Sequence, residues 1–201
     1  MALLIATGNA GKLAEFRRLL RDIEIVGAAD VGLGDLKVSE DGDCFRDNAL
    51  LKARAYAQAA GCMAVADDSG LEVDALDGEP GVQSARFGGP GLTDADRCQL
   101  LIERLQDLPT AARTARFRCH LIATTPDGVL QVEATGTCEG QITTQLQGDG
   151  GFGYDPVFLV PNLQATLAQI APEEKNRISH RGQAIGALRA PLLAAFPELA
   201  H

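Results

Sequence analysis

The segment "LLIATGNAGKLAEFRRLL" (residues 3–20) determines the class of fold. Residues 3–6 form a short apolar run that predicts a buried strand, and the loop "TGNAGK" (residues 7–12) follows it. The apolar side chains after the loop recur at helical spacing: Leu13, Phe16, Leu19 and Leu20. A strand, a glycine loop and a helix in this order predict an α/β fold. The loop supplies backbone N–H groups and Lys12 at a helix N-terminus, where anions bind.

The next segments extend this prediction. Residues 23–26 and 63–66 are apolar and predict two further strands. Between them we expect a long helix that starts at residue 43 or 44 and ends at Gly61. A parallel sheet with helical connections fits this order of elements.

The second half of the chain has a different pattern. Residues 115–125 alternate apolar and polar side chains, and residues 129–138 return after the turn "TPDG", which predicts an antiparallel hairpin. From residue 167 onward the pattern is helical, with expected breaks at residues 180–182 and at Pro191. Together the two halves predict a mixed β-sheet flanked by helices.

Composition limits the possible functions. We interpret residues 1–201 as one domain, long enough to bury a core. The net charge of −9 argues against binding to a nucleic acid backbone, which needs a basic face. No apolar run approaches the roughly 20 residues that span a bilayer, so we expect no membrane association. Five cysteines, an odd number without a CxxC pair, predict reduced thiols in a cytoplasmic protein.

Acidic residues at two places in the sequence, Asp67 with Asp68 and Glu40, suggest a metal site. Asp67 and Asp68 follow the predicted strand at residues 63–66, at the strand end where ligands bind in α/β sheets. Adjacent strand residues point in opposite directions, so one aspartate can serve structure and the other a site. An Asx turn that closes the strand is the alternative. Glu40, in a polar loop, could supply a second ligand, because Mg²⁺ binds one or two carboxylates plus substrate phosphates.

Two later segments suggest ligand contacts. "GGFGYDPVF" (residues 150–158) sets aromatic rings beside a carboxylate, which suits a nucleobase. A tight loop with Phe152 and Phe158 as core anchors is the alternative. "EEKNRISHRGQA" (residues 173–184) gathers basic side chains near a helix break, either as a solvated face or as the lining of a cleft.

Seven segments, which in this order span essentially the whole chain, closely resemble the inosine triphosphate pyrophosphatase family: TGNAGK, SEDG, DNALLKARA, ADDSGLEVDAL, PGVQSARF, GGFGYDPVF and EEKNRISHRGQA. Within the family they are most similar to its bacterial dITP/XTP branch. The resemblance implies a Mg²⁺-dependent enzyme that hydrolyses nonstandard purine nucleoside triphosphates (ITP, dITP, XTP) to the monophosphate and pyrophosphate. Such enzymes remove these nucleotides before their incorporation into DNA or RNA. The implied fold is an elongated mixed sheet with two lobes around a central cleft, usually in a homodimer.

The resemblance assigns the phosphate and metal positions. The residues that match substrate-binding positions other than those for the base are Thr7, Gly8, Asn9, Ala10, Gly11, Lys12, Lys52, Ser69 and Lys175. Glu40 and Asp68 match the metal-binding acids, and Asp68 also matches the catalytic proton acceptor for the attacking water. Three of the chain's four lysines thus fall on motif positions.

The base-binding positions follow in the same way. Phe152 matches the residue that stacks on the base, with Asp155 and the backbone of Gly153 and Tyr154 beside it. The residues matched to the base edge are His180 and Arg181.

Two other functions remain as alternatives. A Maf-like pyrophosphatase for pyrimidine or modified nucleotides would share the metal chemistry but lack the FGYD and SHR segments. A nucleotide sensor that holds a triphosphate without cutting it would not need Glu40 and Asp68.

Arg86, in "SARF", is expected to line the cleft.

Overall fold

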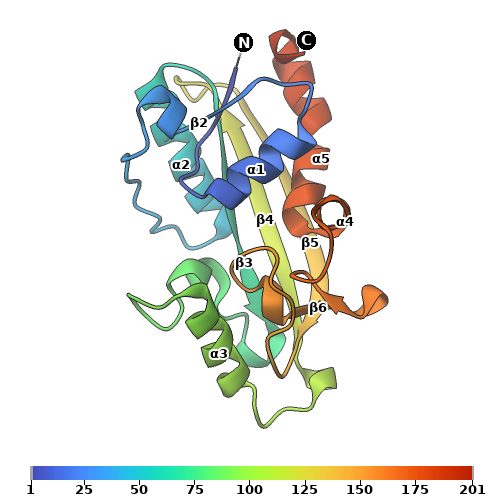
Figure 1. The fold of residues 1–201 in the computed structure, drawn as a ribbon. Coiled ribbons are helices and arrows are strands. Elements are labelled where there is room, and N and C mark those ends of the chain that lie inside the picture. Colours follow the sequence, from blue (N-terminus) through green and yellow to red (C-terminus); the bar gives the residue numbers. More distant parts are fainter. Residues whose placement is uncertain (1, 201) are drawn as a thin grey trace. The chain divides into compact units, whose positions relative to one another are not determined.

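The computed structural model describes residues 2–200 and shows a mixed α/β protein (Figure 1). Seven strands form one sheet in the order β2-β1-β3-β4-β5-β6-β7. The strands are β1 Leu3–Ile5, β2 Ile25–Gly27, β3 Ala64–Val73, β4 Thr114–Thr124, β5 Gln131–Ile142, β6 Phe158–Val160 and β7 Ala165–Thr166. The α-helices are α1 Ala10–Leu19, α2 Phe45–Ala60, α3 Asp94–Arg104, α4 Pro172–Ile178 and α5 His180–Ala195. β1 pairs in parallel with β2 and β3, whereas β6 is antiparallel to β5 and β7, which confirms the mixed sheet.

The chain divides into two compact units. Unit 1 contains the chain up to Asp68, residues Cys119–Gly136 and the chain from His180, and unit 2 contains Ser69–Arg118 and Thr137–Ser179. Because the boundaries fall inside β3, β4 and β5, each of these strands contributes residues to both units.

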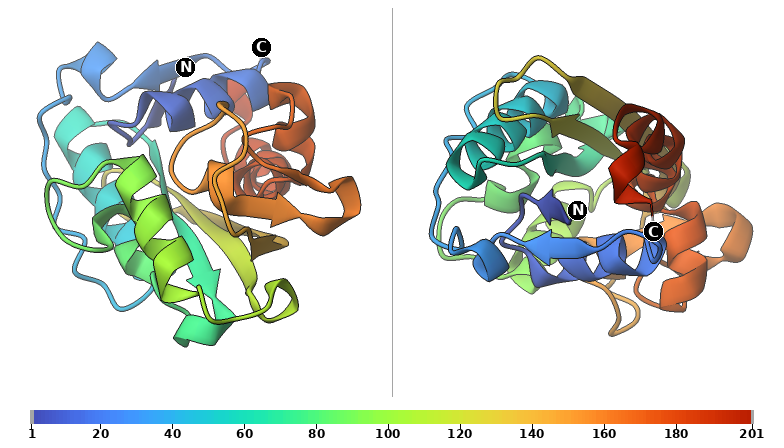
Figure 2. Two further views of the ribbon diagram at one scale, coloured as in Figure 1. Left: turned by 60° about the horizontal axis from the view of Figure 1, so that its bottom comes forward. Right: turned by 90° about the horizontal axis from the view of Figure 1, so that it is seen from above.

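Unit 1 packs helices on both faces of its strands. On β1, Leu3 and Ile5 join a core cluster with α1 and α5, and these two helices contact each other. Leu4 and Ala6 join a second cluster with the alanine-rich face of α2. The alternation of a strand therefore puts α2 on one face and α1 with α5 on the other (Figure 2).

Strand β3 is longer than its sequence indicated. The apolar run at residues 63–66 predicted a strand that ends before Asp67, whereas β3 continues through Asp67 and Asp68 to Val73. The apolar residues beyond the aspartates are fully buried, and their packing outweighs the low strand propensity of aspartate. The aspartates therefore do not lie at the end of β3. They lie just beyond the point where its parallel neighbour β1 ends, at Ile5.

Several local predictions are confirmed. α2 has Cys44 as its N-cap and Gly61 as its C-cap. β4 and β5 are neighbours in the sheet and are joined by a short turn at residues 125–130, which is the predicted hairpin.

The C-terminal region differs from its prediction. The helix expected from residue 167 begins later, at Pro172, because proline fits the first helical position. The break lies at Ser179, whose backbone is extended (φ −67°, ψ 153°), so His180 begins α5 and does not interrupt a helix. α5 then continues through Pro191, because the leucines on either side are buried in the core and hold the helix in place.

Unit 2 has its own core. The apolar side of α3 packs in one cluster with buried residues of β4, β5 and β6, and the rings of Phe117 and Phe158 lie 4.7 Å apart between centroids. α3 begins with a capping box, in which Thr93 and Asp96 bond to each other's backbone N–H groups. Among the described residues, no helix combines the length and apolar character that crossing a membrane requires.

Candidate active site

The adjacent residues Asp67 and Asp68 point to opposite faces of β3, as the strand alternation predicted. Asp67 lies on the face of Val65, which packs with α1 and α5. Asp68 lies on the face of Ala66, which packs with α2. Each carboxylate therefore meets a different set of cations.

On the α2 face, two carboxylates converge on one ammonium group. The Nζ atom of Lys52 lies 3.0 Å from Oδ1 of Asp68 and 2.8 Å from Oε2 of Glu40. Nδ2 of Asn48 donates to the other oxygen, Oδ2, of Asp68 at 3.2 Å. Asn48 and Lys52 are one helical turn apart and so reach Asp68 from the same face of α2.

These contacts shift the pKa values of Asp68 and Glu40 in opposite directions. Burial raises the pKa of Asp68, and the charge of Lys52 offsets this only in part. Burial acts in the same direction on Glu40, but the hydrogen bond and charge of Lys52 hold the pKa of Glu40 below its ordinary value. The pKa of Asp68 is thus shifted upward, which suits a group that must take a proton, whereas the pKa of Glu40 is shifted downward.

The same pair of acids fits Mg²⁺. Both groups offer hard carboxylate oxygens directed at a single positive charge, that of Lys52. Across residues 2–200, no group of three or more His, Cys, Asp or Glu side chains is arranged to hold a metal ion. Mg²⁺ needs only one or two carboxylates when substrate phosphates and water complete its octahedron, so the residues present suit an ion that arrives with a phosphorylated substrate.

On the opposite face, Asp67 belongs to a buried ion network. Its Oδ1 lies 2.9 Å from Nζ of Lys12, and its Oδ2 accepts from Nε of Arg181 at 3.0 Å. Nη1 of Arg181 donates to Oε2 of Glu15 at 2.7 Å. Burial alone would raise the pKa of Asp67, but Lys12 and Arg181 outweigh it and hold that pKa far below its ordinary value. Asp67 is thus ionised near neutral pH and anchors two cations.

This network bears on the expected role of Arg181. Two of its guanidinium nitrogens donate to buried acids, and its side chain is only 3% exposed. His180, the first residue of α5, is also buried. That these two residues meet the edge of a base stays a prediction.

The loop at residues 7–12 has the conformation of a helix cap. Asn9 is the N-cap of α1, and its Oδ1 accepts from the backbone N–H of Lys12 at 3.0 Å. The N–H of Asn9 donates to Oγ1 of Thr7 at 3.1 Å, while Gly8 and Ala10 are exposed. The N–H groups of Asn9 and Lys12 are thus bonded within the loop, and anion binding at its exposed residues stays a prediction.

In unit 2, the segment at residues 150–158 forms a platform around Phe152. Oδ2 of Asp155 accepts from the N–H of Phe152 at 2.8 Å and from Nζ of Lys175 at 2.7 Å. The ammonium of Lys175 also lies 4.8 Å from the centre of the Phe152 ring. Gly151 is required here, because its φ is +73° and a Cβ would lie 2.0 Å from Asp155. Lys175, expected to face phosphates, thus contacts the residues expected to hold the base.

The platform is fixed to the rest of unit 2 by contacts that sequence reasoning missed. The N–H of Gly153 donates to Asp94 at 2.8 Å, and Sγ of Cys98 donates to its carbonyl at 3.4 Å. The hydroxyl of Tyr154 donates to the carbonyl of Ser84 at 2.8 Å. Asp94 and Cys98 both belong to α3, so one helix holds both backbone groups of Gly153.

The remaining predicted positions are less informative. Ser69 lies partly buried on β3, directly after Asp68. Arg86 is exposed, and its Nε donates to the side chain of Gln83. Its expected place in a cleft stays a prediction.

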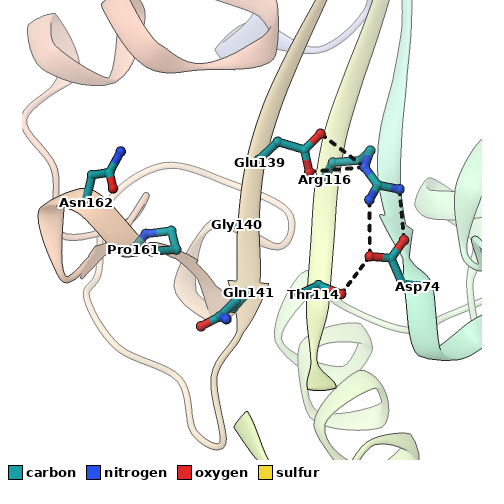
Figure 3. A pocket seen from close by; sticks show the side chains of 8 residues that line it. All are labelled: Asp74, Thr114, Arg116, Glu139, Gly140, Gln141, Pro161 and Asn162. Atoms are coloured by element: carbon teal, nitrogen blue, oxygen red, sulfur yellow. Dashed lines mark hydrogen bonds and ion pairs between the residues drawn. The ribbon is translucent and has the colours of Figure 1, made fainter. Parts of the chain in front are cut away.

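A separate pocket of about 430 Å³ lies in unit 2 (Figure 3). Arg116 in its wall lies 2.9 Å from Oδ1 of Asp74 and 3.1 Å from Oε2 of Glu139, and Thr114 donates to Asp74. The charges of this pocket are therefore paired with one another. None of the predicted site residues lines it.

Sequence reasoning also missed Asn48 and Glu15. Both are polar side chains buried on faces that otherwise pack apolar residues. A buried polar residue needs a partner, and that requirement was the available signal. The partner itself could not be identified, because Asp68 and Arg181 lie far away in the sequence.

Comparison with known proteins identifies the family of this chain. The sequence profile of the Ham1 family matches residues 3–191. The dITP/XTP pyrophosphatase of Desulforamulus reducens is 47% identical over 189 residues, which cover 92% of each chain. The dITP/XTP pyrophosphatase of Exiguobacterium sibiricum is 46% identical, and the alignment covers 98% of this chain and 100% of that protein. The solved structure of a HAM1 protein from Coxiella burnetii matches with a TM-score of 0.87 at 40% identity, over 96% of this chain and 100% of that one. By sequence and by fold, this chain belongs to the Ham1 family.

Proposed function

We propose that this protein hydrolyses nonstandard purine nucleoside triphosphates, such as ITP, dITP and XTP, to the nucleoside monophosphate and pyrophosphate, with Mg²⁺ as cofactor. The observation that carries the proposal is the convergence of Glu40 and Asp68 on one ammonium group. The relatives named dITP/XTP pyrophosphatase, at 47% and 46% identity over nearly the whole chain, support the substrate class.

The residues of unit 1 carry the phosphate chemistry in this proposal. Backbone N–H groups of residues 7–12 and the ammonium groups of Lys12 and Lys52 bind the triphosphate. Glu40 and Asp68 hold Mg²⁺, which when bound neutralises phosphate charge and acidifies water. Asp68 accepts the proton of a water molecule as its oxygen attacks the α-phosphorus. The bond from this phosphorus to the bridging oxygen breaks, and pyrophosphate leaves with the electron pair.

The platform of unit 2 carries base recognition. Phe152 stacks on the purine, and its ring is held in place by its own backbone contact with Asp155 and by Lys175. The groups proposed to lie beside the base are Asp155 and the backbone of Gly153 and Tyr154. His180 and Arg181 are proposed to meet the base edge.

The setting of the enzyme is part of the same proposal. All five cysteines are free, which agrees with a reducing compartment, and we place the protein in the cytoplasm. A homodimer is proposed from the family resemblance and is tested by light scattering of the purified chain.

Hydrolysis of ITP in H₂¹⁸O tests the reaction. We expect IMP and pyrophosphate as products, with the label in IMP, because water attacks the α-phosphorus. Label in pyrophosphate would contradict this point of attack, and IDP with inorganic phosphate would contradict the reaction class. A chain that only binds triphosphate would release no pyrophosphate. Excess EDTA must abolish turnover, and restored Mg²⁺ must return it, if Glu40 and Asp68 act through a metal.

A further inference from the structure

The side chain of Asn48 links the two acids of the proposed metal site. Its Nδ2 donates to Oδ2 of Asp68 at 3.2 Å, and its Oδ1 accepts from the backbone N–H of Gly42 at 2.8 Å. Gly42 lies two residues after Glu40 in the same loop. One amide group therefore ties the loop that carries Glu40 to the strand that carries Asp68.

The orientation of this amide has a single solution. The backbone N–H of Gly42 can only donate, so it must face the amide oxygen of Asn48. The ionised carboxylate of Asp68 can only accept, so it must face the amide nitrogen. Asn48 is 1% exposed, and a buried amide whose two ends both have partners is fixed in its rotamer.

Asn48 and Lys52 together divide the oxygens of Asp68. Lys52 lies against Oδ1, which is on the side of Glu40, while Asn48 holds Oδ2. Because Oδ2 is held, the carboxylate plane cannot rotate freely. Oδ1 therefore stays directed at the ammonium group of Lys52, which also contacts Glu40. A ligand held in its orientation before the metal arrives loses less entropy when the metal binds.

Gly42 shows how tightly the loop side of this link is packed. A Cβ at this position would lie 2.8 Å from Cβ of Asp47 and 2.9 Å from Oδ1 of Asn48. Gly42 is not among the residues with positive φ, so its backbone would accept alanine and the obstacle is steric. The absence of a side chain thus permits the hydrogen bond to Asn48.

We propose that Asn48 is a positioning residue for the metal site: through its paired hydrogen bonds to Gly42 and Asp68 it sets the separation and orientation of Glu40 and Asp68 for a divalent cation. The proposal rests on the proposed function for the identity of the metal ligands. Asn48 does not touch substrate or metal, and it acts through the two carboxylates.

Metal affinity tests this inference directly. The binding of Mn²⁺ alone, followed by the EPR signal of the free ion, is measured for the wild-type chain and for Asn48→Ala, Gly42→Ala and Gln58→Ala. We expect Asn48→Ala to bind Mn²⁺ roughly 10- to 100-fold more weakly, as is usual when a partner of a metal ligand is removed. Gly42→Ala, which keeps the amide but displaces the loop, must weaken binding in the same direction. Gln58→Ala removes an exposed amide from the same helix and is the matched control.

Two further measurements separate positioning from a structural role. Mg²⁺ titrations of ITP hydrolysis should show a matching rise in the half-saturating Mg²⁺ concentration, with kcat at saturating Mg²⁺ reduced less. A purely structural role would lower the melting temperature but leave the metal affinity of the folded variant unchanged, and that result would overturn the inference. If Asn48→Ala does not fold, Gly42→Ala carries the test, and wild-type affinity in it would count against the inference.

The outcomes also separate this inference from the proposed function. Weakened Mn²⁺ binding in both variants supports the positioning role even if the wild-type chain releases no pyrophosphate from ITP, which would contradict the function alone. A wild-type chain that binds no Mn²⁺ would contradict the metal site and the inference together.

Discussion

At the scale of single residues, the adjacent aspartates Asp67 and Asp68 show how one dipeptide serves two purposes. The alternation of β3 sends Asp67 to Lys12 and Arg181, and sends Asp68 to Lys52. The first carboxylate is locked as an anion, and the second has its pKa raised by burial. Two residues of the same type therefore differ in role because of what each face of the strand contacts.

Replacing Asp68 with asparagine tests its role as base. An amide cannot accept the proton of water and is a weak ligand for Mg²⁺, so Asp68→Asn should lower kcat for ITP by at least ~10²-fold. Binding of ITP, measured by calorimetry, should largely survive, because the lysines and Phe152 remain. Turnover close to that of the wild type would show that another group takes the proton.

Asp67 is expected to matter for stability. Asp67→Asn removes the buried counter-charge of Lys12 and leaves Arg181 with Glu15 alone, and it should cost about 3–5 kcal/mol of unfolding free energy near neutral pH. The folded pKa of Asp67 lies below its ordinary value of 3.8, so its contribution is complete above that pH and is lost as the pH falls below it. The stability difference between wild type and variant should therefore shrink in acid.

Urea unfolding at several pH values measures this difference. Asp22→Asn is the control, because Asp22 forms an exposed ion pair with Arg189 and its loss should change stability little. A deficit in Asp67→Asn no larger than that of the control would mean that the buried network contributes nothing.

At the scale of elements, α2 and α3 each support one part of the proposed site. α2 presents Asn48 and Lys52 to Asp68, and the first turns of α3 hold Gly153 through Asp94 and Cys98. In both cases a helix turn places two side chains on one target. The loops and strands carry the predicted ligand contacts, while the helices hold them in position.

The contact between α3 and the platform can be tested on its own. Asp94→Ala removes the acceptor for the N–H of Gly153, a loss of roughly 0.5–1.5 kcal/mol that would raise KM for ITP by about 2- to 10-fold. kcat should change less, because the proposed metal ligands, Glu40 and Asp68, belong to unit 1. Gln99→Ala, which removes an exposed side chain from the same helix, is the control. Equal KM values in both variants would mean that Asp94 does not support base binding.

At the scale of the whole molecule, the sequence predicted what contiguous residues encode. The helix after the loop at residues 7–12 and the hairpin depend on short-range patterns, and each is confirmed. The continuation of β3 depends on the packing of apolar residues beyond the aspartates. The hydrogen bond between Asn48 and Asp68 joins residues that are distant in the sequence, and hydrophobic periodicity carries no information about such contacts. The motifs indicated a candidate site, whereas its supporting contacts depend on how distant parts of the chain fold together.

The choice of base is the property that depends on the most parts of the chain at once. Inosine and xanthosine present an oxo group at C6 and a proton on N1, whereas adenosine presents an amino group and a bare N1. A donor such as His180 suits the oxo group, and a carboxylate or carbonyl near Asp155 suits the N1 proton. Mispaired buried groups can reject the wrong base by about 10⁴-fold. ITP, dITP and XTP should therefore be hydrolysed far faster than ATP. GTP shares the oxo edge and should be rejected less strongly than ATP, through its 2-amino group. Pyrophosphate release, coupled to an inorganic pyrophosphatase, measures kcat/KM for each nucleotide, and equal values for ATP and ITP would show that the platform and its neighbours do not select the base.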